Sequence, residues 1–267
     1  MKNKRLIILL SIFAFLILIV VLSSTVFTVR EKSISIEWHS SALTHLKDKD
    51  DEIIDAVPTK ENVMLMDKKG IVAKLEKTFP YINVLKIEKK FPNKIIVHAI
   101  ERQDQYAILV GANYYALDDQ GKVLNRYSLE EYNALSINKK PIPFEVVGMT
   151  IEEDAMQIGK IANISRVLSA MQTLSDALKK SGFTETYQVI NNFDSVRLEF
   201  GYVSTLTIVN NRNIAIEIDD INNGFSKKLL YGIAISRTDQ FKDKTDITLE
   251  IGLDSEGKVV VGYPDTP

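Results

Sequence analysis

The 267-residue sequence has no cysteine, one tryptophan and three histidines. Without cysteine the chain forms no disulfide, thiolate metal site or thiol nucleophile. His39 and His45 are six residues apart, so they do not lie on one helical face as i,i+4 metal ligands would, and no third ligand accompanies them in a recognisable pattern. We therefore expect neither a bound metal nor a cofactor.

Charge of one sign is not in excess either, because 33 basic residues face 35 acidic ones. A chain this close to neutral has no overall field that attracts nucleic acid. The phosphate-cradling patterns G-x-G-x-x-G and G-x-x-x-x-G-K-[ST] are absent, and so is the G-x-S-x-G nucleophile motif. We expect no nucleic-acid partner and no small-molecule substrate.

Few residues remain that could carry catalysis. Adjacent acids at 118–119, 152–154 and 219–220 suggest a glycosidase-like hydrolase as one alternative, but acids in turn-like sequence are usually solvated. His98 is either a general base or a polar residue on the less buried face of a strand, since its neighbours at 95, 97 and 99 point the other way. We favour the second reading and expect no catalytic residue.

One long hydrophobic run is present, from Leu6 to Leu22, interrupted only by Ser11. A helix needs about 20 mostly apolar residues to cross a bilayer, and the basic residues at 2, 4 and 5 favour a cytoplasmic N-terminus. We expect a tail over 1–5, a transmembrane helix over 6–28 and an extracytoplasmic remainder. A cleaved signal peptide is the alternative, although residues 22–25 fit a cleavage site poorly.

Beyond this run, alternating strand-like and helix-like patterns predict an α+β fold. The first domain, 29–102, is expected to have the order β-α-α-β-β. Its predicted elements are a strand over 32–38, a helix over 40–57 capped by Ser40 or Ser41, a helix from the N-cap Asp67 to Pro80, and strands over 82–89 and 94–102.

The second domain, 103–267, is expected to be a mainly antiparallel β domain with one covering helix over 161–180. The strand signals are a hairpin over 106–128, strands in YQVIN, SVRLEFG, VSTLTIVN and NIAIEID, and a closing pair around Asp254–Gly257. Pro141 and Pro143 indicate a loop, and residues 225–233 a short helix. The last strand is expected at or near a sheet edge.

Two kinds of surface in this arrangement could recruit a protein partner. An exposed strand edge accepts an added strand. If the two helices of the first domain cover one face of its sheet, Ile96 and Ile100 remain on the other face for a neighbour. The alternative is that the second domain packs there.

The residues that close the first domain resemble a known family. FPNKIIVHAIER resembles the Phe-Pro-Asn, alternating apolar and Glu-Arg run of the FtsQ/DivIB family of bacterial cell-division proteins. ENVMLMDKKGIVAKLEKTFPYINVLKIEKKFP, YYALDDQGKVLN and LDSEGKVVVGY resemble other family stretches in the same order, and PIPFEVVG stands where the family has a Leu-Pro-x-x-x-Gly loop. The proline that often follows Glu-Arg in the family is absent here.

The resemblance implies a POTRA domain followed by a β domain, and a non-enzymatic single-pass scaffold at the division septum. It implies small bitopic partners of the FtsB/DivIC and FtsL type and a link to septal peptidoglycan synthesis. The partner strand would dock on Val259, Val260, Val261, Gly262 and Tyr263, with Glu101 and Arg102 at the interdomain hinge. A POTRA-bearing assembly factor or sensor, and a membrane-anchored wall hydrolase, remain as alternatives.

Overall fold

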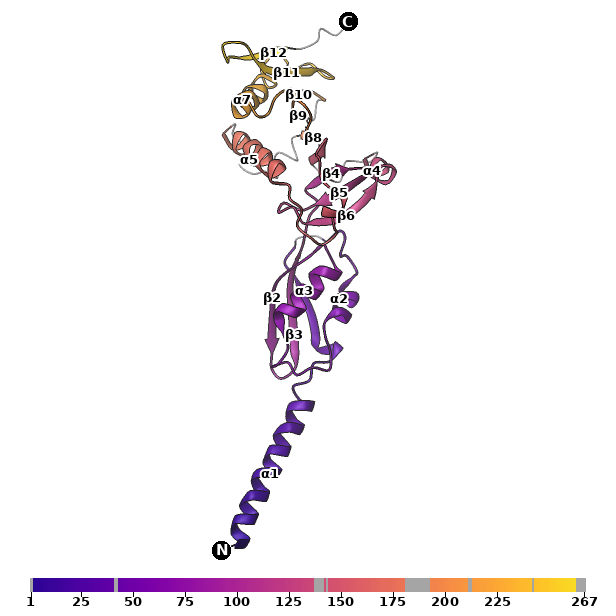
Figure 1. Cartoon of the computed structure of the whole chain (residues 1–267), viewed down its shortest axis with the longest axis vertical. Coiled ribbons are helices and arrows are strands. Elements are labelled where there is room, and N and C mark those ends of the chain that lie inside the picture. The colour runs from indigo at the N-terminus through magenta and orange to yellow at the C-terminus, as the bar shows by residue number, and fades with distance from the viewer. Residues whose placement is uncertain are drawn as a thin grey trace. The chain divides into compact units, whose positions relative to one another are not determined.

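The computed structural model describes residues 2–40, 43–136, 142, 144–180, 193–210, 213–241 and 243–262. The chain divides into two compact units, Met1–Arg102 and Gln103–Pro267. Each unit combines helices with a β-sheet, as Figure 1 shows. The prediction of a mixed α+β fold is confirmed.

The first unit begins with the helix α1 (Lys2–Thr25). This helix covers most of the range, 6–28, in which a transmembrane helix was expected. Among the residues that the structure describes, no helix combines the length and the apolar character that crossing a bilayer requires. The transmembrane prediction is therefore not supported by the structure.

The rest of the first unit is a three-stranded sheet with two helices in the order expected. Strand β3 is central, parallel to β1 and antiparallel to β2. The elements are the 3-10 turn η1 (Glu31–Ser33), β1 (Ile34–Trp38), α2 (Asp50–Ala56), α3 (Lys68–Thr78), β2 (Ile82–Lys90) and β3 (Lys94–Glu101). Asp67 caps α3 as predicted, because its carboxylate accepts a hydrogen bond from the Lys69 amide.

Helix α2 is much shorter than the helix over 40–57 that the sequence pattern predicted. Asp48 has a left-handed backbone (φ 61°), which ends any continuous helix before α2 begins at Asp50. Ser40 does not cap a helix; its hydroxyl accepts a hydrogen bond from the Glu101 amide at 2.7 Å. The other proposed cap, Ser41, lies outside the described residues.

The second unit is built on a sheet of nine described strands in the order β12-β11-β10-β9-β8-β7-β4-β5-β6. The strands are β4 (Tyr106–Val110), β5 (Asn113–Leu117), β6 (Val123–Ser128), β7 (Phe144–Val147), β8 (Phe193–Glu199), β9 (Thr205–Asn210), β10 (Ala215–Ile218), β11 (Thr248–Leu253) and β12 (Val259–Gly262). Its helices are α4 (Leu129–Ser136), η2 (Glu153–Ala155), α5 (Ser165–Lys180) and α7 (Phe225–Ile235).

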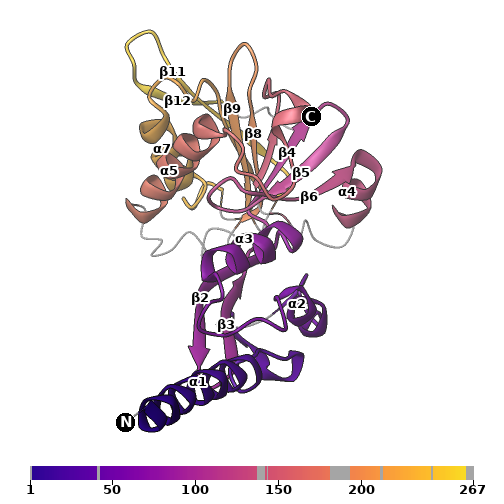
Figure 2. The ribbon, with the colours of Figure 1, turned by 60° about the horizontal axis from the view of Figure 1, so that its bottom comes forward.

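Both faces of this sheet are covered over part of their area. In Figure 2, α5 and α7 lie together on one side of the large sheet and α4 lies on the other. The alternation of β5 explains this, because Tyr115 joins the larger core while Tyr114 joins the smaller core with Tyr132 of α4. Burial on both faces fixes the register of these strands.

Three features of this unit differ from the sequence-based expectation. The run from Tyr106 is two strands rather than one, because Gly111 turns the chain with φ 60°. The segment after Pro143 contains the inner strand β7, which pairs in parallel with β4 and β8. The helix α5 begins at Ser165, four residues later than expected. The strand expected in YQVIN lies outside the described residues.

Candidate functional site

The most exposed strand of the large sheet is β12, which stands at one end of the strand order. It pairs with β11, Val260 lying opposite Gly252 and Val259 opposite Leu253. Val260 keeps 44% of its surface exposed, whereas Val259 and Val261 are half-buried against the core. Four of the five residues expected in the C-terminal docking strand therefore form an edge strand, and Tyr263 lies outside the described residues.

The turn before β12 determines which backbone groups face the open edge. The Asp254 amide donates to the Lys258 carbonyl at 2.9 Å and the Gly257 amide donates to the Asp254 carbonyl at 3.0 Å, with Gly257 at φ 72°. This is a three-residue hairpin loop, in which the Asp254–Lys258 pair is hydrogen-bonded. Because antiparallel pairs alternate, the N–H and C=O groups of Val259 and Val261 point away from β11.

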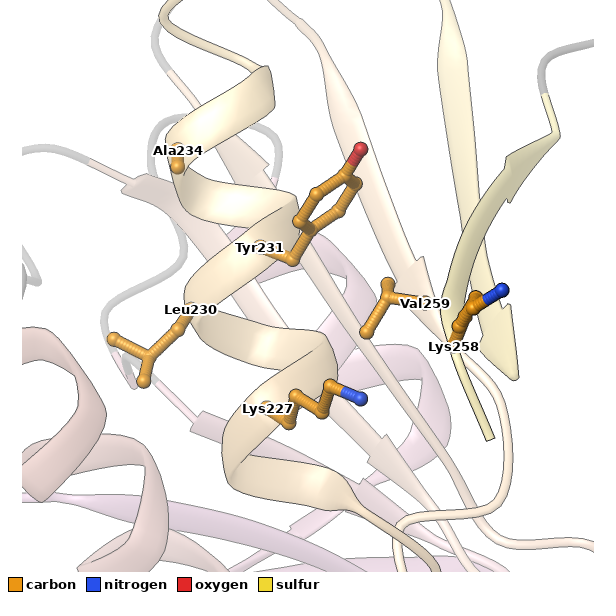
Figure 3. Close-up of a pocket in the computed structure, with 6 residues that line it drawn as sticks. All are labelled: Lys227, Leu230, Tyr231, Ala234, Lys258 and Val259. Carbon is orange, nitrogen blue, oxygen red and sulfur yellow. The ribbon is translucent and has the colours of Figure 1, made fainter. Parts of the chain in front are cut away.

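A groove lies between β12 and the helix α7, with a volume of about 510 Å³. Figure 3 shows Tyr231 and Lys227 projecting from α7 on the side where Val259 and Lys258 lie. Leu230 and Ala234 complete the lining, which is mostly apolar. The groove can receive apolar side chains of an extended segment. At its rim, the Lys227 ammonium group donates to the Gly257 carbonyl at 2.8 Å and that of Lys258 lies 2.7 Å from the Glu256 carboxylate.

Lys228, the residue next to Lys227, is buried and does not line the groove. Its ammonium group donates to the backbone carbonyls of Asp219 and Asp220, the latter at 2.8 Å. The Asp219 carboxylate lies 3.3 Å from the same nitrogen. Lys228 thus fastens the loop after β10 to α7, and no sequence pattern distinguishes it from Lys227.

The other predicted partner residues, Ile96 and Ile100, belong to β3 in the first unit. Ile96 is only 2% exposed, so the expectation that its face stays open for a neighbour is wrong for this residue. Ile100 is half-buried. His98, which lies between them, is also buried, at 6% exposed. The expectation that it lies on the less buried face of the strand is therefore wrong. Hydrogen bonds of its ring to His39 and Glu88 explain how a polar side chain is accommodated there.

The predicted hinge residues are both engaged within the first unit. The carboxylate of Glu101, 4% exposed, accepts hydrogen bonds from the amides of Thr44, His45 and Leu46 at 2.5 to 2.8 Å. Arg102 donates to the Ile82 carbonyl and lies 3.7 Å from the Glu76 carboxylate. This pair therefore holds the loop before α2 and the start of β2 in place.

The acidic pairs considered for a hydrolase also have structural partners. Asp118 is buried and accepts hydrogen bonds from the amides of Gln120 and Lys122. Glu153 accepts hydrogen bonds from Tyr115 and Asn113, each at 3.2 Å. Asp219 binds Lys228, as described above.

Comparison with known families is decisive for the first unit. The family model described as "POTRA domain, FtsQ-type" matches residues 45–102. The chain carries an FtsQ-type POTRA domain. The resemblance to the FtsQ/DivIB family that the sequence motifs indicated is thereby confirmed for this domain. No curated protein matches the chain.

Sequence reasoning missed one cluster in this POTRA domain. It compared His39 with His45, but the structure brings His39 and Glu37 to His98, with ligand-type atoms within 4.8 Å of one another. The parallel register of β1 and β3 sets Glu37 opposite His98. The alternating Glu-x-His pattern at the end of β1 is the signal that, combined with this pairing, could have found the cluster.

Proposed function

We propose that the chain is a non-enzymatic, membrane-anchored scaffold of the bacterial division machinery. On this proposal, β12 recruits an extended segment of a partner by strand addition. The observation that carries the proposal is an edge strand beside an apolar groove, in a chain with an FtsQ-type POTRA domain. The partners we propose are small bitopic division proteins of the FtsB/DivIC and FtsL type, which would link the chain to septal cell-wall synthesis.

The backbone of β12 supports this mode of recruitment. Val259 and Val261 each turn an N–H and a C=O toward the open edge, and an added strand would satisfy them. The proposed docking segment runs from Val259 through Val260, Val261 and Gly262 to Tyr263. An incoming strand gains affinity from these hydrogen bonds, and apolar side chains placed against Tyr231 and Leu230 would give specificity.

The membrane anchor is proposed from the sequence. The apolar run from Leu6 to Leu22 behind a basic tail would place the N-terminus in the cytoplasm and the POTRA domain outside. A scaffold with this topology would meet partners whose own extracytoplasmic segments extend from the same membrane. We expect it to gather at the septum.

Val261→Pro provides a sharp test of strand addition. Proline lacks the N–H that points to the open edge, while the hydrogen bonds of Val260 and Gly262 to β11 are retained. We expect at least a tenfold loss in capture of the FtsB/DivIC-type partner by the tagged full-length chain, about 1.4 kcal/mol. Lys258→Ala, at the rim of the groove, is the matched control and should reduce capture much less.

Hydrogen exchange separates loss of docking from loss of folding. In Val261→Pro, amides of β10 and β11 should stay as protected as in the wild type. Unchanged capture by this variant would refute docking at β12. A charge at Val260 gives a second variant, whose exposed side chain should weaken capture through desolvation rather than through a lost donor.

Localisation tests the division role separately. A fluorescent fusion of the full chain should concentrate at midcell in dividing cells of the native bacterium. A uniform membrane signal would contradict the division role and favour a POTRA-bearing assembly factor or sensor.

Neutralising Glu152, Glu153 and Asp154 together should leave function intact after correction for stability, and loss of function without loss of folding would favour a hydrolase.

A further inference from the structure

Four polar side chains gather on the face of the POTRA sheet where His98 lies. Glu37 belongs to β1, His39 follows it, His98 belongs to β3 and Glu88 to β2. His98 Nδ1 lies 3.2 Å from Glu37 Oε2 and 3.1 Å from His39 Nε2. On the other side of the ring, His98 Nε2 lies 3.0 Å from Glu88 Oε2.

Strand pairing builds this cluster rigidly. Glu37 is opposite His98 in the parallel register, and the His39 amide donates to the Ala99 carbonyl at 2.9 Å. Side chains two residues apart on a strand point to the same face, so Glu37 and His39 approach His98 together. The three groups are thus positioned by backbone hydrogen bonds rather than by flexible loops.

Two polar atoms from β1 and the residue after it converge on one nitrogen of the His98 ring. A carboxylate only accepts hydrogen bonds, so His98 Nε2–H donates to Glu88 and a neutral ring then has a lone pair at Nδ1. That lone pair faces both the His39 nitrogen and the Glu37 oxygen. A proton or a metal ion on Nδ1 would satisfy the Glu37 oxygen, and a metal ion would engage the His39 nitrogen as well.

We propose that Glu37 Oε2, His39 Nε2 and His98 Nδ1 bind a divalent transition metal ion of the Zn²⁺ class. Tetrahedral Zn²⁺ with bonds of about 2.0 to 2.1 Å needs ligand atoms about 3.3 to 3.4 Å apart, close to the 3.1 and 3.2 Å found here. The His98–Glu88 hydrogen bond supplies the carboxylate that typically orients a metal-binding imidazole.

The surrounding charges and exposure fit this ligand. Lys86 and Lys90 each lie 3.6 Å from the Glu88 carboxylate and offset its charge, whereas Glu37 lies 3.2 Å from His98 Nδ1. Glu37 and His39 are exposed, so an ion can enter and a water can fill the fourth position. Two imidazoles and one carboxylate favour Zn²⁺, Ni²⁺ or Cu²⁺ over Mg²⁺ and Ca²⁺. The bound ion would tie β1 to β3.

Calorimetric titration of the purified full-length chain in detergent micelles with ZnCl₂ tests the site. We expect one Zn²⁺ per chain and no heat with MgCl₂. His39→Gln should weaken Zn²⁺ binding by about tenfold or more, and His45→Gln is the matched control, because its ring stacks on Tyr81 outside the cluster. Equal Zn²⁺ affinity in the wild type and His39→Gln would overturn the proposal.

A second variant removes any dependence on the buried histidine. Because His98 is buried, His98→Gln loses stability as well as a ligand, whereas Glu37→Gln changes an exposed side chain. Co²⁺ in the wild-type site should give the visible absorption of a four-coordinate ion, and Glu37→Gln should reduce it while His45→Gln keeps it. Absorption that is the same in all three proteins would also overturn the proposal.

Discussion

The last strands of the two units occupy opposite kinds of position. In the POTRA domain, β3 is the central strand and ends in Glu101, a carboxylate buried among backbone amides. In the second unit, β12 is an end strand with an exposed Val260 and a groove beside it. The charged strand end is therefore structural, while the plain valine run has the features of a docking surface. Conspicuous charge is a poor guide to function here.

If each of the two units is stabilised by its own core, a substitution that unfolds one unit should leave the other folded. Gly148 follows β7 with φ 75°, and a Cβ there would lie 1.9 Å from the Phe200 carbonyl oxygen. We expect Gly148→Ala to lower the stability of the second unit by about 4 kcal/mol, from left-handed strain and backbone displacement. Hydrogen exchange of the full chain should show lost protection over 103–262 and normal protection over 31–102.

Gly159→Ala is the matched control, since it also has a positive φ but no atom lies within 4 Å of a Cβ there. It should cost only the conformational strain, about 1 to 2 kcal/mol. Equal effects of the two substitutions would mean that the close approach of Phe200 to Gly148 is unimportant. Loss of protection in both units would contradict their independence.

Glu101→Gln tests the buried strand end. The amide side chain retains one oxygen acceptor but turns an NH₂ group toward backbone N–H donors. We expect the POTRA domain to lose about 2 to 3 kcal/mol, because charge-assisted hydrogen bonds are replaced by an unfavourable contact. The measurement is the urea dependence of hydrogen exchange over 43–102, with the exposed Glu61→Gln as control. Changed partner capture without lost stability would instead support the hinge role expected from the sequence.

Adjacent lysines on α7 sharpen the contrast within the second unit. Lys228→Met removes the buried ammonium group and leaves the carbonyls of Asp219 and Asp220 without this donor, so we expect a loss of about 2 kcal/mol. Lys227→Met, one residue away at the groove, removes an exposed hydrogen bond to the Gly257 carbonyl in the turn before β12, so stability should fall by only about 0.5 kcal/mol while partner capture weakens. Urea unfolding of both variants measures the loss of stability, and pull-down of the partner measures the loss of capture. The reverse pattern would contradict the assignment of the two lysines.

Local patterns predicted much of this architecture. Helical spacing after Asp67 and alternation over 82–102 are short-range signals, and they gave the β-α-α-β-β order. The edge strand β12 was also expected, because a glycine-containing turn marks its hairpin. Strand β7 was missed, since four residues after two prolines are too short a run to show a period.

The features that could not be predicted from the sequence depend on contacts between residues far apart in the chain. His39 and His98 are 59 residues apart, and only the register of β1 with β3 brings them together. The burial of Ile96, which is 2% exposed, is likewise not revealed by alternation within one strand. Lys228 and Lys227 have the same chemistry in sequence, yet Lys228 donates to the loop after β10 from a buried position and Lys227 donates to the turn before β12 from an exposed one.

The smallest predicted effect is the contribution of one buried tyrosine, Tyr106, to the stability of the second unit at alkaline pH. Burial, together with the charges of Asp119 and Asp118, raises the pKa of Tyr106 to about 12. The unfolded chain releases this proton near pH 10, so between pH 10 and 12 Tyr106 lowers stability as pH rises, by about 1.4 kcal/mol per unit. Burial also raises the pKa values of Tyr114, Tyr115 and Tyr132, which add to the total slope. Tyr106→Phe should reduce the total slope by this one proton, with the free energy of unfolding of the second unit in urea measured at pH 9 and pH 11. Tyr231→Phe, at an exposed position on α7, should retain the full slope, and an unchanged slope in Tyr106→Phe would show that another group is responsible.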